Sequence, residues 1–328
     1  MDVPSIFEKF SEKRVLVIGD VMIDAYVEGK VTRISPEAPV PIVNLSNRSQ
    51  RLGGAANVAL NLISLGAKPI LTSVVGDDNG GDTLVRLMGD TGMDLSGIER
   101  SKSRKTTVKT RVIGNSQQLL RIDDEVVSPL TQSEEDVLLN NVRDHIKEVD
   151  AIIFEDYNKG ILTPIVIRAI IELANENNVI TTVDPKKENF FEYQNVTLFK
   201  PNLKELKEGL NVDFDLKPHD KDFEKSIAEL ESRLSNKISF VTLSEHGVFI
   251  KDSSQKHYIP AHIRNISDVS GAGDTVISVA TLCLAIGMPI RDAAAWANIA
   301  GGLVCEKSGV VPIDKAHLRA EVEKLTKG

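Results

Sequence analysis

Short apolar segments rich in β-branched residues alternate with helical patterns along most of the chain. Residues 14–19 (RVLVIG) are typical of a strand buried on both faces of a parallel sheet. After residue 150 the alternation is regular, and polar residues follow each strand, at what should be one rim of the sheet. The pattern predicts an α/β fold with strands at 69–75, 151–154, 179–183, 196–199 and 238–243 and helices at 164–175, 223–234, 290–305 and 315–324.

Two segments depart from this alternation, at about 25–45 and about 104–122. Each has the pattern of two short strands without an intervening helix, and the first contains the proline-rich stretch 35–39. We expect each to leave the main body as an antiparallel excursion, and the two to pair into a small sheet that forms a lid over a ligand site. No repeat or linker divides the chain, so residues 1–328 are predicted to form a single domain with this lid.

Composition narrows the class of protein. The chain has 328 residues, of which 41% are hydrophobic and 26% are charged, as in ordinary globular proteins. The net charge of −8 argues against a nucleic-acid partner, and no apolar run is long enough to cross a membrane. The N-terminus lacks the pattern of a signal peptide, and Cys283 and Cys305 lie in apolar segments, so we expect a cytoplasmic protein with reduced thiols. The six histidines lack the spacing of metal ligands, so no zinc site is predicted.

Residues 268–275 (DVSGAGDT) carry the strongest chemical signal, a glycine-rich turn that leads into a mostly apolar helix. Gly271 and Gly273 let a ligand approach the backbone, and the free N–H groups of the first helical turn then form an anion site. An acid at this position would repel phosphate, so Asp274 is better explained as a base that takes a proton from an attacking hydroxyl. The alternative is that Asp274 only caps the helix and the glycines only make a tight turn.

A second glycine pair, Gly53 and Gly54, precedes a second helix that carries Asn57 on its first turn. Asn57 offers a donor and an acceptor, which suits a polyol, unless its side chain faces solvent. Asp20 and Asp24 follow the first strand, where open α/β sheets bind ligands. Both could hold sugar hydroxyls, and the alternative is that both are turn residues.

The two glycine-rich segments resemble the two signatures of the ribokinase (PfkB) family of sugar kinases, and the resemblance spans essentially the whole chain. Residues 53–57 (GGAAN), with Gly66 and residues 76–78 downstream, match the N-terminal signature. Residues 268–274 match the C-terminal signature, with Val269 in place of the usual threonine. The resemblance implies a ribokinase-like three-layer α/β/α sandwich with a mostly parallel central sheet and a small β lid. It also implies ATP and Mg²⁺, with the magnesium held mostly through water and ATP oxygens.

Within the family the chain is most similar to the kinases of heptose 7-phosphate. The similarity rests on residues 33–41 (RISPEAPVP), which a generic ribokinase lacks, and on residues 19–24, 117–123, 156–160 and 183–186. It implies ATP-dependent phosphorylation of the anomeric C1 hydroxyl of D-glycero-D-manno-heptose 7-phosphate to the 1,7-bisphosphate, in lipopolysaccharide core heptose precursor synthesis. In some bacteria such a kinase is fused to an adenylyltransferase. Because this sequence ends at Gly328, we expect a separate adenylyltransferase downstream in the pathway.

The resemblance also assigns roles position by position. Asp274 would be the catalytic base, and the transferring phosphoryl group would be stabilised by backbone N–H groups of Gly271, Ala272 and Gly273. The sugar would be bound by Asp24, Gly53, Gly54 and Asn57. The nucleotide and its magnesium would be bound by Asn202, Glu205, Thr242, Ser244, Gly247 and Asn298. A monovalent cation, K⁺, would be held near Asp268 and Ser270.

The phosphate of the substrate needs cationic partners of its own, and an arginine can hold a dianion through two hydrogen bonds. The candidates are Arg33, Arg111, Arg121, Lys159 and Lys186, of which Arg111 and Arg121 lie on the second lid segment. For each of them the alternative is a surface salt bridge.

Other functions stay open on the sequence alone. The nearest is a PfkB kinase for another sugar or sugar phosphate, such as fructose 6-phosphate or ribose. A non-catalytic sugar-sensing protein is a second alternative, against which the intact Asp274 segment speaks. A dinucleotide dehydrogenase is excluded because residues 19–22 (GDVM) lack the spaced glycines of a pyrophosphate-binding turn. An exposed lid edge could pair with a second subunit, so a homodimer is expected.

Overall fold

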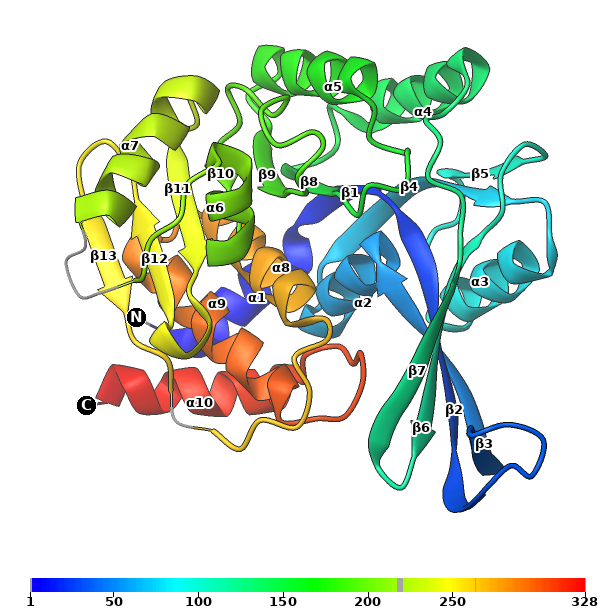
Figure 1. Cartoon of the computed structure of the whole chain (residues 1–328). Coiled ribbons are helices and arrows are strands. Elements are labelled where there is room, and N and C mark those ends of the chain that lie inside the picture. The colour runs from blue at the N-terminus through cyan, green and yellow to red at the C-terminus, as the bar shows by residue number, and fades with distance from the viewer. Residues whose placement is uncertain (1, 217–220, 263, 328) are drawn as a thin grey trace.

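The computed structural model describes residues 2–216, 221–262 and 264–327. Its centre is a nine-stranded sheet with the strand order β13-β12-β11-β10-β9-β8-β1-β4-β5 (Figure 1). Neighbouring strands from β11 to β5 are parallel, and β12 and β13 continue the sheet as an antiparallel edge. The strands are β1 (Arg14–Gly19), β4 (Lys68–Gly76), β5 (Ile98–Ser101), β8 (Ala151–Glu155), β9 (Ile180–Asp184), β10 (Leu198–Phe199), β11 (Ile238–Thr242), β12 (Val248–Lys251) and β13 (Lys256–Ile259).

Helices cover both faces of this sheet and give the predicted three-layer α/β/α arrangement. One apolar core lies between the sheet and α1 (Val3–Glu12), α2 (Ala55–Leu65), α3 (Asn79–Asp90), α8 (Ala272–Ala285), α9 (Ile290–Cys305) and α10 (Lys315–Lys327). The other lies between the opposite face and α4 (Gln132–His145), α5 (Pro164–Glu176), α6 (Leu203–Leu210) and α7 (Lys221–Leu234). Strand β1 serves both cores, because Val15 and Val17 join the first while Leu16 and Ile18 join the second. None of the described helices is both long and apolar enough to cross a bilayer.

A second sheet, which we call the lid sheet, extends away from the main body (Figure 1). It has the order β3-β2-β6-β7 and consists of β2 (Val21–Ile34), β3 (Pro41–Gly54), β6 (Thr107–Gly114) and β7 (Gln117–Asp124). The two predicted excursions therefore do pair, through the parallel neighbours β2 and β6.

Some predicted boundaries are wrong. Strand β2 begins at Val21, so Asp24 lies within a lid strand and not in a turn after β1. Gly53 and Gly54 end β3 and lead directly into α2. Strand β10 lacks the first half of the predicted strand 196–199. There the N–H groups of Thr181 and Thr197 donate to each other's side-chain hydroxyls, at 3.2 and 2.9 Å.

Candidate active site

Asp274 lies on the first turn of α8, where the glycine-rich segment meets the helix. Gly271 makes the turn possible, because its φ of +78° lies in the left-handed region. Gly273 comes close to the rim of the sheet, and a Cβ at this position would lie 3.1 Å from Oδ2 of Asp184. The N–H of Ala272 already donates to the carbonyl of Val269 at 3.3 Å. Of the three predicted anion donors, Gly271, Ala272 and Gly273, the N–H of Ala272 is thus engaged within the turn.

The Asp274 carboxylate is held from two sides. Asn57 on α2 donates to Oδ2 at 2.7 Å, and the Tyr157 hydroxyl donates to Oδ1 at 2.9 Å. Burial raises the pKa of Asp274 to about 6, with help from the charge of Asp184, while the two hydrogen bonds oppose this rise. A carboxylate with this pKa is ionised at neutral pH and can still accept a proton during a reaction.

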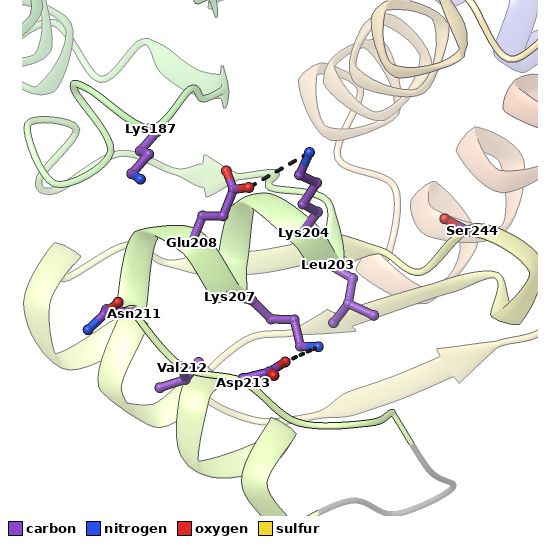
Figure 2. Close-up of a pocket in the computed structure, with 9 residues that line it drawn as sticks. All are labelled: Lys187, Leu203, Lys204, Lys207, Glu208, Asn211, Val212, Asp213 and Ser244. Atoms are coloured by element: carbon purple, nitrogen blue, oxygen red, sulfur yellow. Dashed lines mark hydrogen bonds and ion pairs between the residues drawn. The ribbon is translucent and has the colours of Figure 1, made fainter.

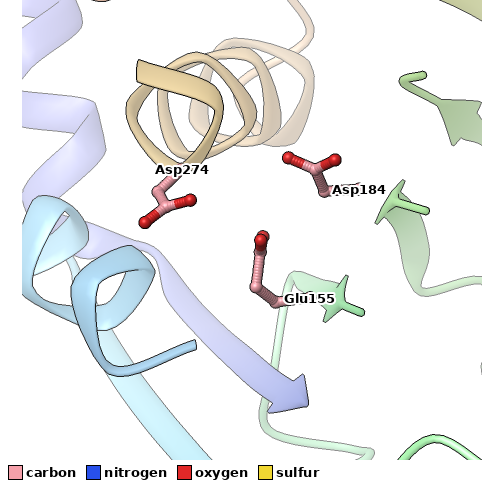
Figure 3. A group of neighbouring side chains, drawn as sticks. All are labelled: Glu155, Asp184 and Asp274. Carbon is pink, nitrogen blue, oxygen red and sulfur yellow. The ribbon is translucent and has the colours of Figure 1, made fainter. Parts of the chain in front are cut away.

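Three carboxylates converge beside this turn (Figure 3). Oxygen atoms of Glu155, Asp184 and Asp274 lie within 4.8 Å of one another, and all three residues are buried. Lys200 balances Asp184 through an ion pair of 2.8 Å, whereas neither oxygen of Glu155 has a hydrogen-bond partner among the described residues. Burial and the charges of Asp184 and Asp274 raise the pKa of Glu155. Mg²⁺ prefers carboxylate oxygens as ligands, so this cluster fits a divalent cation.

Asp20 binds backbone groups. Its carboxylate accepts hydrogen bonds from the N–H groups of Tyr157, Lys159 and Ile161, at 2.8, 3.1 and 3.2 Å. The residue is 1% exposed, which leaves it no surface for a ligand in this state. The sequence leaves open whether Asp20 binds sugar hydroxyls or is a turn residue, and the structure supports the turn residue. Asp20 fixes the segment 157–161, which carries Tyr157.

Asp24 and Arg111 form an ion pair across the lid strands β2 and β6. Their side chains are 5% and 15% exposed, so the pair is largely shielded from water. Gly53 makes room for it, because a Cβ there would lie 2.4 Å from Oδ2 of Asp24. The guanidinium groups of Arg111 and Arg51 lie 5.5 and 5.1 Å from the centroid of the Tyr26 ring. The lid sheet thus holds a largely shielded cation, Arg111, against Asp24 and beside Gly53.

The remaining basic candidates for the substrate phosphate lie elsewhere or are paired with acids. Arg33 lies on an exposed part of β2. Lys186 is 3.8 Å from Asp184, which puts it beside the acid cluster and not on the lid sheet. The ion pairs of this group are Arg121–Asp123 at 2.8 Å, Lys159–Glu125 at 2.8 Å, and Lys186–Glu205.

Residues predicted to bind the nucleotide lie on the segments that follow β10 and β11 and on α9. Asn202 and Glu205 form a capping box on α6, in which each side chain accepts the other's N–H at 2.8 Å. Thr242 ends β11, and the short 3₁₀ turn after it runs from Ser244 to His246 and is closed by Gly247. On α9, Asn298 donates to the carbonyl of Pro260 at 2.8 Å.

An open depression of about 620 Å³ lies against α6 (Figure 2). Its lining consists of Lys187, Leu203, Lys204, Lys207, Glu208, Asn211, Val212, Asp213 and Ser244. Ser244 is shared with the predicted nucleotide site, but none of the three clustered carboxylates lines the depression. The depression therefore borders the predicted nucleotide site without containing the acids expected to carry the chemistry.

Asp268 organises the loop before the glycine-rich turn. Its two carboxylate oxygens accept the N–H groups of Ser270 and Gly309, at 3.0 and 2.9 Å. Burial tends to raise the pKa of Asp268, but these hydrogen bonds outweigh it and lower the pKa. Val269, which replaces the usual threonine, is 69% exposed. The cation role of Asp268 and Ser270 stays a prediction.

No role is predicted from the sequence for Glu155, Tyr157 or Asp184. Glu155 ends β8, Asp184 ends β9, and Tyr157 follows β8 by two residues. Their position after buried strands was the available signal, because parallel strands bring their carboxyl ends to one rim. The sequence does not show which of these side chains face Asp274.

The geometry suits phosphoryl transfer to a hydroxyl, and the fold is that of the ribokinase-like carbohydrate kinases. The match extends to the sequence, because residues 12–316 fit the profile of the pfkB family of carbohydrate kinases. The chain belongs to this family and is an ATP-dependent sugar kinase.

Sequence alignments with curated relatives extend over most of this chain. It is 41% identical over 312 residues to the bifunctional protein HldE of Methylobacillus flagellatus, and 40% identical over 297 residues to that of Helicobacter pylori strain 26695. These matches cover 94% and 90% of this chain but 63% and 64% of the two relatives. The chain thus spans less than two thirds of the length of the curated relatives it matches.

Solved structures share the fold at low sequence identity. Phosphofructokinase-2 from Escherichia coli in complex with potassium aligns with a TM-score of 0.77 at 18% identity, covering 95% of this chain and 99% of that one. Arabidopsis thaliana ribokinase complexed with ribose and ATP aligns with a TM-score of 0.71 at 15% identity, covering 96% and 99%. These likenesses support the ribokinase-like fold alone.

Proposed function

We propose that this kinase transfers the γ-phosphoryl group of ATP to the anomeric C1 hydroxyl of D-glycero-D-manno-heptose 7-phosphate. The observation that carries the proposal is a buried acid, Asp274, on a glycine-rich helix start, combined with a lid sheet that holds the shielded cation Arg111. Two relatives named HldE, at 41% and 40% identity, and the segment 33–41 favour a heptose over other sugars. The 1,7-bisphosphate would be made in the cytoplasm as a lipopolysaccharide core precursor.

In the proposed reaction Asp274 accepts the proton of the C1 hydroxyl while the hydroxyl oxygen attacks the γ-phosphorus. The new C1–O–P bond forms as the bond between the γ-phosphorus and its bridging oxygen breaks, and ADP leaves with that oxygen. Backbone N–H groups at Gly271, Ala272 and Gly273 would stabilise the charge on the phosphoryl oxygens, and the N–H of Ala272 would first have to leave the carbonyl of Val269.

Asp24 and Asn57 would hold the sugar hydroxyls. Oδ1 of Asn57 is buried and has no hydrogen-bond partner among the described residues, so it can accept a hydrogen bond from a hydroxyl. Gly53 and Gly54 keep the backbone beside these groups free of side chains. Sugar hydroxyls would donate to Asp24 in place of Arg111. The guanidinium group of Arg111 could then bind the 7-phosphate.

ATP would lie between the Asn202–Glu205 capping box and the turn from Thr242 to Gly247, with its adenine near Asn298. Glu155 and Asp184 would hold Mg²⁺, which neutralises charge on the transferring phosphate when bound. K⁺ near Asp268 and Ser270 is part of the proposal, supported by the potassium complex of the phosphofructokinase-2 neighbour.

A kinase for another sugar phosphate, such as fructose 6-phosphate, is the second candidate. Arg111 would recognise the phosphate of such a sugar as well, and a phosphofructokinase shares the fold. Ribose is less favoured, because it carries no phosphate for this buried cation. The sugar-sensing alternative is set aside, because the chain belongs to a family of kinases.

The lid sheet would also form a homodimer. The exposed apolar side chains on its strands, which are 40% to 58% exposed, are Ile34, Leu45, Leu119, Leu120 and Ile122, and Val40 on the β2–β3 connection is 52% exposed. Strand β7 is an edge strand whose outer backbone groups could pair with a second copy. Adenylyl transfer to the product would fall to a separate enzyme, or to the part of the bifunctional relatives that this chain does not match.

The identity of the product tests the proposed function. The protein would be incubated with ATP, Mg²⁺ and heptose 7-phosphate, and the reaction followed by ³¹P NMR. We expect a second sugar-phosphate resonance that couples to the anomeric proton. A new resonance coupled to another ring proton, or release of inorganic phosphate alone, would contradict the proposal.

A further inference from the structure

Tyr157 occupies a position that the sugar needs. Its hydroxyl donates to Oδ1 of Asp274 at 2.9 Å, while Asn57 donates to Oδ2 at 2.7 Å. Asp274 is only 3% exposed, so its two oxygens are covered by these neighbours. A sugar hydroxyl that gives its proton to Asp274 is a donor of the same kind as the phenol of Tyr157. The two donors therefore compete for one acceptor.

Of the two donors, Tyr157 is the one that can move. Asn57 is 0% exposed within α2, and its backbone carbonyl is bound by Asn61 at 2.9 Å. Tyr157 lies on the connection after β8, is partly exposed, and has its backbone N–H fixed by Asp20 at 2.8 Å. Its ring lies 5.2 Å from the Lys186 ammonium, a contact that does not lock the side chain. A rotation of the side chain would release Asp274 without disturbing the backbone.

The phenol does not compete as a nucleophile. The Tyr157 hydroxyl keeps its proton and uses it as the donor to Oδ1 of Asp274 at 2.9 Å. Without this donor, a water molecule could occupy the same acceptor. Its oxygen could attack the γ-phosphorus, its proton would pass to Asp274, the bond to the bridging oxygen would break, and ADP and inorganic phosphate would result.

We propose that Tyr157 occupies Asp274 until the sugar hydroxyl replaces it, and that it thereby protects bound ATP from hydrolysis. Tyr157 is thus a positioning residue that makes phosphoryl transfer depend on the sugar. This inference rests on the proposed role of Asp274 as the base. It does not depend on which sugar the kinase phosphorylates.

The test compares Tyr157→Phe with wild type and with a matched control, Tyr193→Phe. Tyr193 also donates its buried hydroxyl to a carboxylate, at 2.7 Å, but that carboxylate is Asp156 and not Asp274. We expect Tyr157→Phe to raise ADP release without sugar by about tenfold, the factor that corresponds to 1.4 kcal/mol. The KM for the sugar should fall, because no hydrogen bond has to be displaced, while kcat stays close to wild type. Tyr193→Phe should change none of these three quantities.

Three results would overturn the inference. The first is unchanged sugar-independent ADP release in a Tyr157→Phe protein whose thermal unfolding matches that of Tyr193→Phe. The second is a raised KM for the sugar, which would make Tyr157 a ligand of the substrate. The third is persistence of the increased hydrolysis in the double variant Tyr157→Phe/Asp274→Asn. The single variant Asp274→Asn distinguishes the proposed base from the proposed role of Tyr157. Its loss of sugar phosphorylation tests Asp274 as the base and does not depend on Tyr157.

Discussion

The amide of Asn57 donates a hydrogen bond of 2.7 Å to the carboxylate of Asp274, although the two residues are 217 positions apart. The contact joins the first turns of α2 and α8, and each helix follows a glycine with positive φ, Gly54 at +60° and Gly271 at +78°. The two glycine-rich segments of the sequence therefore meet at one buried hydrogen bond. This contact is the physical reason for treating the sugar-binding and phosphoryl-binding segments as a single site.

Asp274→Asn should remove the proposed base while keeping a side chain of the same size and shape. An amide cannot accept the hydroxyl proton, so we expect kcat to fall by about 10²–10⁴ while ATP still binds. A coupled ADP assay measures the first quantity and calorimetry the second. Asp90→Asn, an exposed acid on α3, is the control and should keep full activity. Turnover near the wild-type rate in Asp274→Asn would rule out the base.

The pKa of Asp274 predicts the pH profile. Because burial raises this pKa to about 6 and the ionised form is the active base, kcat/KM should rise with pH up to about 6 and level off above it. Asn57→Ala removes a hydrogen bond that favours the ionised form, so the profile should shift to higher pH. Rate measurements from about pH 4 to about pH 8 would show both effects, because this range extends about two units on either side of the pKa. An acid limb at the ordinary carboxyl pKa, unmoved by Asn57→Ala, would be inconsistent with this account.

Arg111→Gln should act on the substrate's phosphate. A charge-assisted hydrogen bond contributes about 1.5–3 kcal/mol, so kcat/KM for heptose 7-phosphate should fall by roughly 10- to 150-fold. The value for unphosphorylated heptose should change much less. Arg86→Gln, which breaks an exposed ion pair on α3, controls for loss of charge. An equal loss for both sugars would mean that Arg111 only supports Asp24.

Asp20→Ala should destabilise the fold. It removes the acceptor of three backbone hydrogen bonds, each worth about 1 kcal/mol, so the free energy of unfolding should fall by about 3 kcal/mol. Asp20→Asn keeps one acceptor oxygen and should lose less. Urea unfolding followed by circular dichroism measures both variants. Equal stability of Asp20→Ala and wild type would show that the segment 157–161 does not depend on Asp20.

The proposed lid dimer predicts a concentration-dependent mass. Leu120→Glu/Ile122→Glu places two charges on the exposed apolar face of β7 and should give monomers in analytical ultracentrifugation. Ile165→Glu changes an apolar residue that is 63% exposed on α5, away from the lid sheet, and should leave the mass unchanged. A wild-type protein that is monomeric at all concentrations would refute the dimer.

The sequence predicts elements best where the periodicity is strong. Helix α9 begins at Ile290 and ends at Cys305 as predicted, because its apolar face is continuous. Helix α4 is not predicted, since it is mostly polar and buries few residues, although Thr131 and Glu134 form a capping box at its start. That pair was a readable signal for the beginning of a helix.

The site is predictable only in part. The two glycine-rich motifs predict that Asn57 and Asp274 belong to one site. The pairing of Asp24 with Arg111, in contrast, depends on strand register. In the lid sheet Tyr26, not Asp24, lies opposite Arg111, so the ion pair runs diagonally between β2 and β6. Likewise Glu155 meets Asp184 because β8 and β9 are neighbours in the sheet. No local pattern in the sequence encodes either arrangement.

The most direct measurement is ADP release from ATP and Mg²⁺ with heptose 7-phosphate, fructose 6-phosphate, ribose or no sugar. We expect a kcat/KM for heptose 7-phosphate well above those for the other sugars, with little release when no sugar is present. A higher kcat/KM for fructose 6-phosphate or ribose would contradict the proposed substrate and leave the kinase mechanism in place. No sugar-dependent release from protein shown to bind ATP would contradict the proposed reaction itself.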